Sequence, residues 1–85
     1  MTLNELVLRL PVPPQPGEHE IVRGPGGMNH LAIIVTARDV PENGGMVREF
    51  AFGLACGVSS VKATDLEVAR GESITCVFCI QWRTT

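Results

Sequence analysis

The chain has 85 residues, of which 45% are hydrophobic and 19% charged, and its formal net charge is −2 at pH 7. This hydrophobic share is ordinary for a folded globular protein, so composition argues against disorder of the whole chain. We expect one small domain spanning residues 1–85, because this length supports a single modest core and is too short for two.

Charge, hydropathy and cysteine content indicate which partners and which location in the cell to expect. The seven basic residues are scattered and the sequence pI is about 5.6, whereas nucleic-acid-binding domains usually carry a basic patch. The apolar run from Leu31 to Val35 is far shorter than the ~20 residues of a membrane helix, so no membrane association is expected. Three cysteines, an odd number, argue against a secreted disulfide framework and favour a cytoplasmic location.

The N-terminal third predicts a strand and a rigid loop. Residues near 3–10 alternate, with Leu6, Leu8 and Leu10 on one face, which indicates a half-buried strand. Prolines crowd residues 11–17 and predict an extended loop there; display of this segment to a peptide-recognition domain is the alternative. Residues 18–23 are ambiguous, with a short edge strand as one interpretation.

The middle of the chain predicts the sheet centre and a helix. Residues 31–35 are apolar on both faces, so we expect a buried central strand near 30–37. A helix is expected near 44–57, with Asn43 as N-cap and Gly57 as its stop. The apolar face of this helix would cover the sheet.

Two further strands are predicted near 66–70 and 74–82, joined as a hairpin. In the second, alternate residues from Ile74 to Trp82 form an apolar face. The expected fold class is therefore α+β: a two-layer arrangement of four, or at most five, mixed or antiparallel strands, covered on one face by a single helix.

Cys76 and Cys79 have the two-residue spacing of zinc and redox sites. On a strand, however, residues three apart point to opposite faces of the sheet, so the two sulfurs would diverge. We therefore interpret these cysteines as buried structural thiols and predict no metal site. Cys56 and the two histidines lack the spacing of a zinc finger or ribbon.

No catalytic residue and no cofactor are predicted. His19 and His30 show no spacing that would bring them together in a pocket. The glycine clusters match neither nucleotide-binding fingerprint, although glycines 44 and 45 precede a predicted helix start that could hold an anion. A small enzyme would need a pocket lined by His30, Glu42 or Asp39.

A possible interface lies on the outer face of the predicted helix. Phe52 and Cys56 are one turn apart there, beside Arg48 and Glu49. Apolar side chains on a face that meets water indicate a contact surface. Cover by the proline loop is the alternative.

From residue 35 onward the order of features resembles the YggU-like family of small uncharacterised proteins. The resemblance rests on Val35-Thr36-Ala37, Gly44, Phe50, Leu54-Ala55, Gly57-Val58-Ser59-Ser60, Glu67, Gly71-Glu72 and the apolar run ending at Ile80. It implies two strands, a loop, a helix and a hairpin, and it implies no settled activity.

Together these features favour a non-enzymatic protein-interaction module acting as an adaptor, an inhibitor or a self-associating subunit. The expected partner is another protein or a second copy of the chain. A small nucleic-acid-binding protein, or a small enzyme with an anion site at the helix start, are the alternatives.

Overall fold

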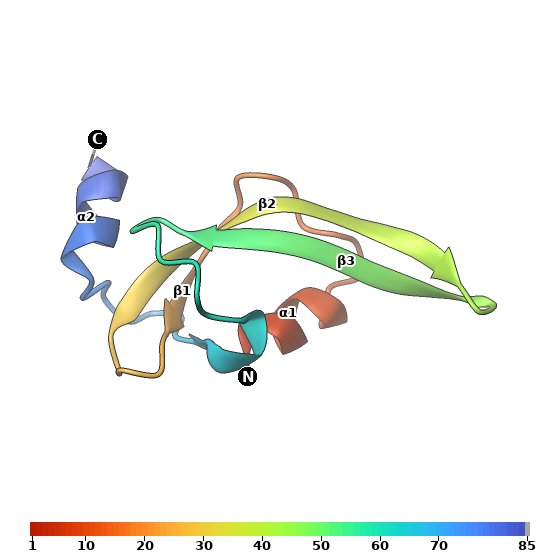
Figure 1. Cartoon of the computed structure of the whole chain (residues 1–85), viewed down its shortest axis with the longest axis horizontal. Helices are drawn as coiled ribbons and strands as arrows, with labels where there is room; N and C mark the ends of the chain where they lie inside the picture. Colours follow the sequence, from red (N-terminus) through yellow and green to blue (C-terminus); the bar gives the residue numbers. More distant parts are fainter. Residues whose placement is uncertain (85) are drawn as a thin grey trace.

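The computed structural model describes the backbone of residues 1–84 and the side chains of residues 1–82. Its elements are α1 (Leu3–Arg9), β1 (His19–Arg23), β2 (Asn29–Glu42), β3 (Gly45–Leu54), a 3-10 turn (Ala63–Asp65), β4 (Glu67–Val68) and α2 (Val77–Thr84). The strands form one curled antiparallel sheet in the order β3-β2-β1-β4. Helix α1 lies beside the long strands, and α2 lies at one end of the molecule (Figure 1). The predicted α+β class and four-stranded sheet are confirmed, whereas a single covering helix is not found.

The predicted central strand is confirmed, because β2 pairs with β1 on one side and β3 on the other. Its apolar residues feed two cores on opposite faces, as the period of two requires. Ala32 and Ile34 join α1 in the larger core, whose buried members are Leu3, Val7, Val22, Ala32, Ile34, Leu54 and Leu66. Leu31 faces the other way and joins a smaller core of Leu31, Ile74, Cys76 and Cys79.

The helix predicted near 44–57 is wrong, because these residues form β3, the second arm of a hairpin with β2. Asn43 and Gly44 form its two-residue loop, with φ of 49° and 80°. Two positive φ values are typical of a type I′ turn, for which Asn-Gly is the preferred sequence. Asn43 therefore starts a hairpin turn rather than capping a helix. A bulge between Ile34 and Thr36 shifts the β2–β3 register.

The strand predicted near 3–10 is also wrong, because these residues form α1. Thr2 and Glu5 build a capping box: the Glu5 N–H donates to Thr2 Oγ1, and the Thr2 N–H donates to Glu5 Oε1. Leu3 and Val7, one helical turn apart, are buried against the sheet. Of the leucines that suggested alternation, Leu6 and Leu10 are one helical turn apart and partly buried, whereas Leu8 is exposed. Residues 11–17 contain no helix or strand, as predicted.

Arg48 on β3 ties the hairpin to the end of α1. Its Nη1 donates to the carbonyl oxygens of Val7 and Leu10 at 2.8 and 2.7 Å. The same guanidinium binds both carboxylate oxygens of Asp39 at 2.8 and 3.1 Å. Arg48 thereby satisfies carbonyls that the last turn of a helix leaves without partners.

The strand predicted near 74–82, and its hairpin with 66–70, are wrong. Only Glu67 and Val68 form β4, which pairs with β1, and residues 77–84 form α2. The Ile80 N–H donates to the Cys76 carbonyl at 3.0 Å, so Cys76 immediately precedes the helix. Cys76 and Cys79 are buried while Val77 and Phe78 are exposed, which is a period of three rather than two. Within residues 1–84, neither α1 nor α2 is long and apolar enough to cross a membrane.

Candidate metal centre

Four side chains that are distant in sequence converge where α2 meets the sheet. They are His30, Cys56, Cys76 and Cys79, and their ligand atoms all lie within 4.8 Å of one another. His30 Nδ1 is 3.6 Å from Cys56 Sγ and 3.8 Å from Cys79 Sγ. Three sulfurs and one imidazole nitrogen are one of the standard ligand sets of structural zinc.

The distances agree with tetrahedral coordination. Zn–S bonds of about 2.3 Å and a Zn–N bond of about 2.0–2.1 Å, at tetrahedral angles, place sulfur about 3.6 Å from nitrogen. The same geometry places two sulfurs about 3.8 Å apart. The observed separations of 3.6 and 3.8 Å from the imidazole nitrogen are close to the first of these values, and every other pair of ligand atoms lies within 4.8 Å.

The prediction that the sulfurs of Cys76 and Cys79 diverge is wrong, because it assumed a strand where the structure has the start of α2. Because Cys76 is the last residue before α2 and Cys79 lies in its first turn, both side chains point toward the sheet. A CxxC pair at a helix start is the arrangement that zinc and redox sites require.

Asn29 fixes the segment that carries Cys76. The buried Asn29 side chain donates from Nδ2 to the Ser73 carbonyl at 2.9 Å, and its backbone N–H donates to Thr75 Oγ1 at 2.8 Å. Its carbonyl accepts from the N–H groups of Thr75 and Cys76, both at 3.0 Å. Asn29 directly precedes His30 on β2. The same stretch of this strand therefore carries His30 and positions Cys76 through these hydrogen bonds.

Cys56 reaches the cluster through a tight turn at the end of β3. The Ala55 N–H donates to the Leu31 carbonyl at 2.9 Å, which holds the chain beside β2. The Gly57 N–H then donates to the Leu54 carbonyl at 2.8 Å, and Gly57 has a φ of 85° that favours glycine. This turn places Cys56 opposite His30 on the neighbouring strand.

The thiols lie in an environment where a cation would be stabilised. Burial raises the pKa of Cys79 to about 11, which reflects the cost of a buried thiolate without a compensating charge. Burial acts in the same direction on Cys76 and is the largest single effect there, but hydrogen bonds from the backbone of Cys79 and Phe78 and from the Cys79 and Cys56 side chains together outweigh it and lower the Cys76 pKa. A bound dication removes the penalty, because thiolates are the form that binds zinc.

The structure separates the residues of the predicted interface. Arg48 and Phe52 share the α1 side of β3, where Phe52 is partly buried against the larger core. Glu49 points to the opposite face and pairs with Arg38. Cys56 belongs to the metal-ligand cluster. Gly57, Val58, Ser59 and Val61 line a hollow together with Phe52.

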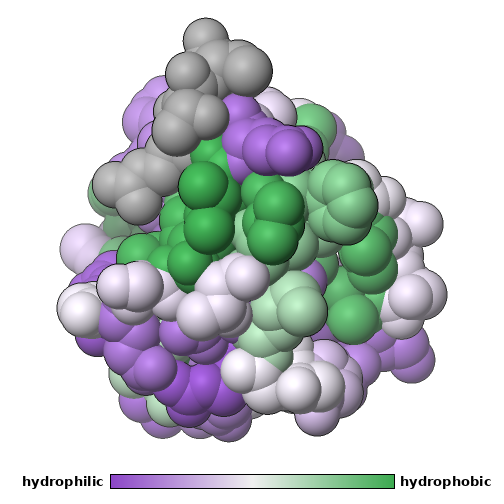
Figure 2. Space-filling model, turned by 90° about the vertical axis from the view of Figure 1, so that its left-hand side faces the viewer, coloured by the Kyte–Doolittle hydropathy of each residue, from purple (hydrophilic) through white to green (hydrophobic). Residues whose placement is uncertain are grey.

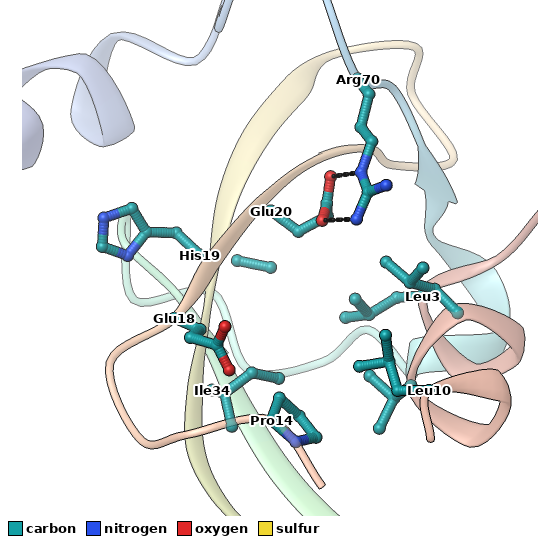
Figure 3. A pocket seen from close by; sticks show the side chains of 11 residues that line it. Leu3, Leu10, Pro14, Glu18, His19, Glu20, Ile34 and Arg70 are labelled. Carbon is teal, nitrogen blue, oxygen red and sulfur yellow. Dashed lines mark hydrogen bonds and ion pairs between the residues drawn. The ribbon is translucent and has the colours of Figure 1, made fainter. Parts of the chain in front are cut away.

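The residues proposed for an enzyme pocket are also apart. His30 belongs to the sulfur cluster, Asp39 is held by Arg48, and Glu42 lies at the far tip of the hairpin. A hollow of about 120 Å³ does occur between α1 and the sheet, lined by Leu3, Leu6, Val7, Leu10, Pro14, Glu18, His19, Glu20, Ala32, Ile34 and Arg70 (Figure 3).

This hollow is apolar within and small. The Arg70 guanidinium binds both oxygens of Glu20 at 2.8 and 3.0 Å on its border (Figure 3). Pockets for drug-sized ligands measure about 300–1,000 Å³. The hollow therefore has less than half the volume of such a pocket, and Arg70 and Glu20 on its border are already paired with each other.

The arginines are distributed among acidic partners rather than gathered. Within the described side chains, the pairs are Arg9–Glu5, Arg23–Glu72, Arg38–Glu49, Arg48–Asp39 and Arg70–Glu20. Paired arginines offer little net positive charge to a phosphate backbone.

Comparison of the chain with protein-family models, with curated proteins and with solved structures finds no match. Membership of the YggU-like family remains a prediction. The helix that this resemblance implied at residues 44–57 is a strand.

Proposed function

We propose that this protein is a small zinc-binding domain in which one Zn²⁺ is held by His30, Cys56, Cys76 and Cys79. The observation that supports this proposal is the convergence of four ligand atoms within 4.8 Å. Catalytic zinc keeps a coordination position open for water or substrate, whereas four protein ligands close the sphere. The proposed ion is therefore structural, and it links α2 to the sheet.

The test is metal content under reducing conditions. The full chain should purify with one zinc ion, and replacement by Co²⁺ should give the visible absorption of tetrahedral cobalt with sulfur-to-metal charge transfer. His30→Ala and Cys79→Ser should lose most of the bound metal. His19→Gln is the matched control, because His19 lies outside the cluster and should leave the metal content unchanged. A chain that binds no metal, or a His19 variant that loses it equally, would refute the proposal.

We further propose that the domain acts as a non-enzymatic interaction module through the outer face of α2. The large apolar residues Val77, Phe78, Ile80 and Trp82 are 41–66% exposed there. Figure 2 shows apolar side chains gathered on the end of the molecule that carries this helix. Exposed apolar patches of this kind support a contact surface. Zinc would then serve to hold that surface in a fixed orientation.

A second copy of the chain is the simplest partner to test. Light scattering of the zinc-loaded protein over a concentration series should show association that Phe78→Ser abolishes. Val58→Ser, which changes an exposed apolar residue outside α2, is the control and should associate normally. A zinc-loaded chain that remains monomeric throughout would remove self-association from the proposed function.

A further inference from the structure

The three sulfurs of the proposed zinc centre are unequally exposed. Cys76 is 3% exposed and Cys79 is fully buried, whereas Cys56 is only partly buried. Cys56 is carried on the turn after β3 rather than on α2. Cys56 is therefore the cysteine of the cluster that keeps contact with water, and it is the one that a small oxidant is expected to meet first.

From this asymmetry we propose that Cys56 is a peroxide-sensitive ligand whose oxidation expels the zinc ion; the inference rests on the proposed zinc centre. Oxidation of cysteine follows thiolate character and access. Bound zinc would keep the ligand deprotonated, and on the turn at residues 54–57 the Cys56 residue is only partly buried. Cys76 and Cys79 supply sulfurs within 4.8 Å that can complete the reaction.

The reaction balances with hydrogen peroxide as oxidant. The Cys56 thiolate attacks one peroxide oxygen, the O–O bond breaks, and Cys56 sulfenic acid and hydroxide are formed. The thiolate of Cys76 or Cys79 then attacks the Cys56 sulfur, a disulfide forms, and a second hydroxide leaves. Two thiolates have lost two electrons and peroxide has gained them. The ion, deprived of two of its three anionic ligands, dissociates from His30 and the remaining thiolate.

This product differs from the one expected of a CxxC pair alone. A Cys76–Cys79 disulfide would leave α2 without a metal or covalent link to β3. A disulfide from Cys56 instead replaces the metal link between β3 and α2 with a covalent one. A disulfide needs S–S of about 2.05 Å, so the sulfurs must close the gap that the ion occupied. The Cys56 turn, which lies outside the strand ladder, can make that movement.

The experiment uses the full chain, loaded with zinc under reducing conditions and then exchanged into buffer without thiols. Hydrogen peroxide is added in the presence of a colorimetric zinc chelator, and the products are mapped as non-reduced peptides. We expect zinc release, with Cys56 in the disulfide and a dimedone adduct on Cys56 when the reaction is trapped early. Reduction with a dithiol followed by added zinc should restore the metal content.

Cys56→His is the informative variant, because it preserves four ligands while removing the accessible sulfur. Its tetrahedral site is verified first with Co²⁺, and its zinc should then be released severalfold more slowly by peroxide. If the variant binds no metal, the peptide map of the peroxide-treated wild-type chain still shows whether Cys56 is in the disulfide. A map showing only a Cys76–Cys79 disulfide, or zinc that resists peroxide, would overturn the inference while leaving the zinc centre intact. A chain that carries no zinc before peroxide is added would instead refute the proposed function itself.

Discussion

Removal of zinc should release α2 while the rest of the fold persists. The fully buried part of the smaller core that holds this helix has two large apolar side chains, Leu31 and Ile74, besides its two cysteines, and Ile21 is only partly buried against it. Burying each contributes about 1.5–3 kcal/mol, or about 3–6 kcal/mol together. Ordering the eight residues of α2 costs about 1–2 kcal/mol of backbone entropy each, or about 8–16 kcal/mol in all. Apolar burial alone therefore falls short by about 2–13 kcal/mol.

Zinc binding is of the size needed to offset this deficit. Structural zinc in small peptides binds with an apparent free energy of about 10–16 kcal/mol near neutral pH. The larger core between α1 and the sheet has seven buried members, none of which is a ligand, and of the four ligands only Cys56 packs against its edge. We therefore expect chelation to unfold the C-terminal segment locally, and not to unfold the whole domain.

The assay can follow the protein's only tryptophan. Trp82 on α2 makes an edge-on contact with the His19 ring on β1, with ring centroids 6.1 Å apart. Chelation should shift Trp82 emission toward that of a solvated indole, and hydrogen exchange should quicken across residues 74–84 but not across β1 and β2. Cys79→Ser in excess zinc should resemble the chelated protein and respond no further to chelator. Full protection of α2 after verified loss of zinc would refute the reasoning.

Three further predictions concern the supporting structure. Leu66→Ala, at a fully buried site of the larger core, should lower the free energy of unfolding by about 2–5 kcal/mol in urea titrations of the zinc-free and zinc-loaded chain alike. Asn29→Ala removes the hydrogen bond to the Ser73 carbonyl and should cost about 1–3 kcal/mol, measured as weaker zinc affinity in competition with a chelator; unchanged affinity would contradict its positioning role. The Arg48 guanidinium holds the pKa of Asp39 below its usual range through hydrogen bonds, so this pair stabilises the fold above the unfolded-state pKa of Asp39. That contribution disappears as pH falls through the folded-state pKa, and Asp39→Asn should flatten this part of the acid denaturation curve.

The parts of the fold that the sequence identified correctly are those with a single interpretation. Residues 31–35 are apolar on both faces and rich in β-branched side chains, which indicates a buried strand. The hairpin was missed because Asn43 can cap a helix or begin a type I′ turn. The alternation of Phe50 and Phe52 after this Asn-Gly pair was the signal that could have decided it.

Helix α1 was missed for a related reason. Leucines at 6, 8 and 10 alternate, but Leu3 and Val7 have helical spacing, and Thr2 and Glu5 form a capping box that the sequence displays. The sequence signal for a helix is therefore present at its first turn, but the alternation of the leucines favoured a strand.

The candidate metal site was missed because of the structure assumed for Cys76 and Cys79. Their spacing is a genuine metal signal, but its meaning depends on whether a helix or a strand carries it. His30 and Cys56 could not be assigned as ligands from spacing, because they reach the cluster through the pairing of β2 with β3. The register of the β2–β3 pairing places His30 and Cys56 side by side, near the start of α2.

The long β2–β3 hairpin has a consequence for how the molecule moves in solution. The chain has a mass of 9.2 kDa, yet its longest dimension is 44 Å against 24 Å in the other two directions. A body of this shape experiences more friction than a sphere of equal mass, and it tumbles at different rates about its long and short axes. Its elution volume would imitate that of a larger protein, so the number of copies in any assembly has to be determined from mass rather than from hydrodynamic radius.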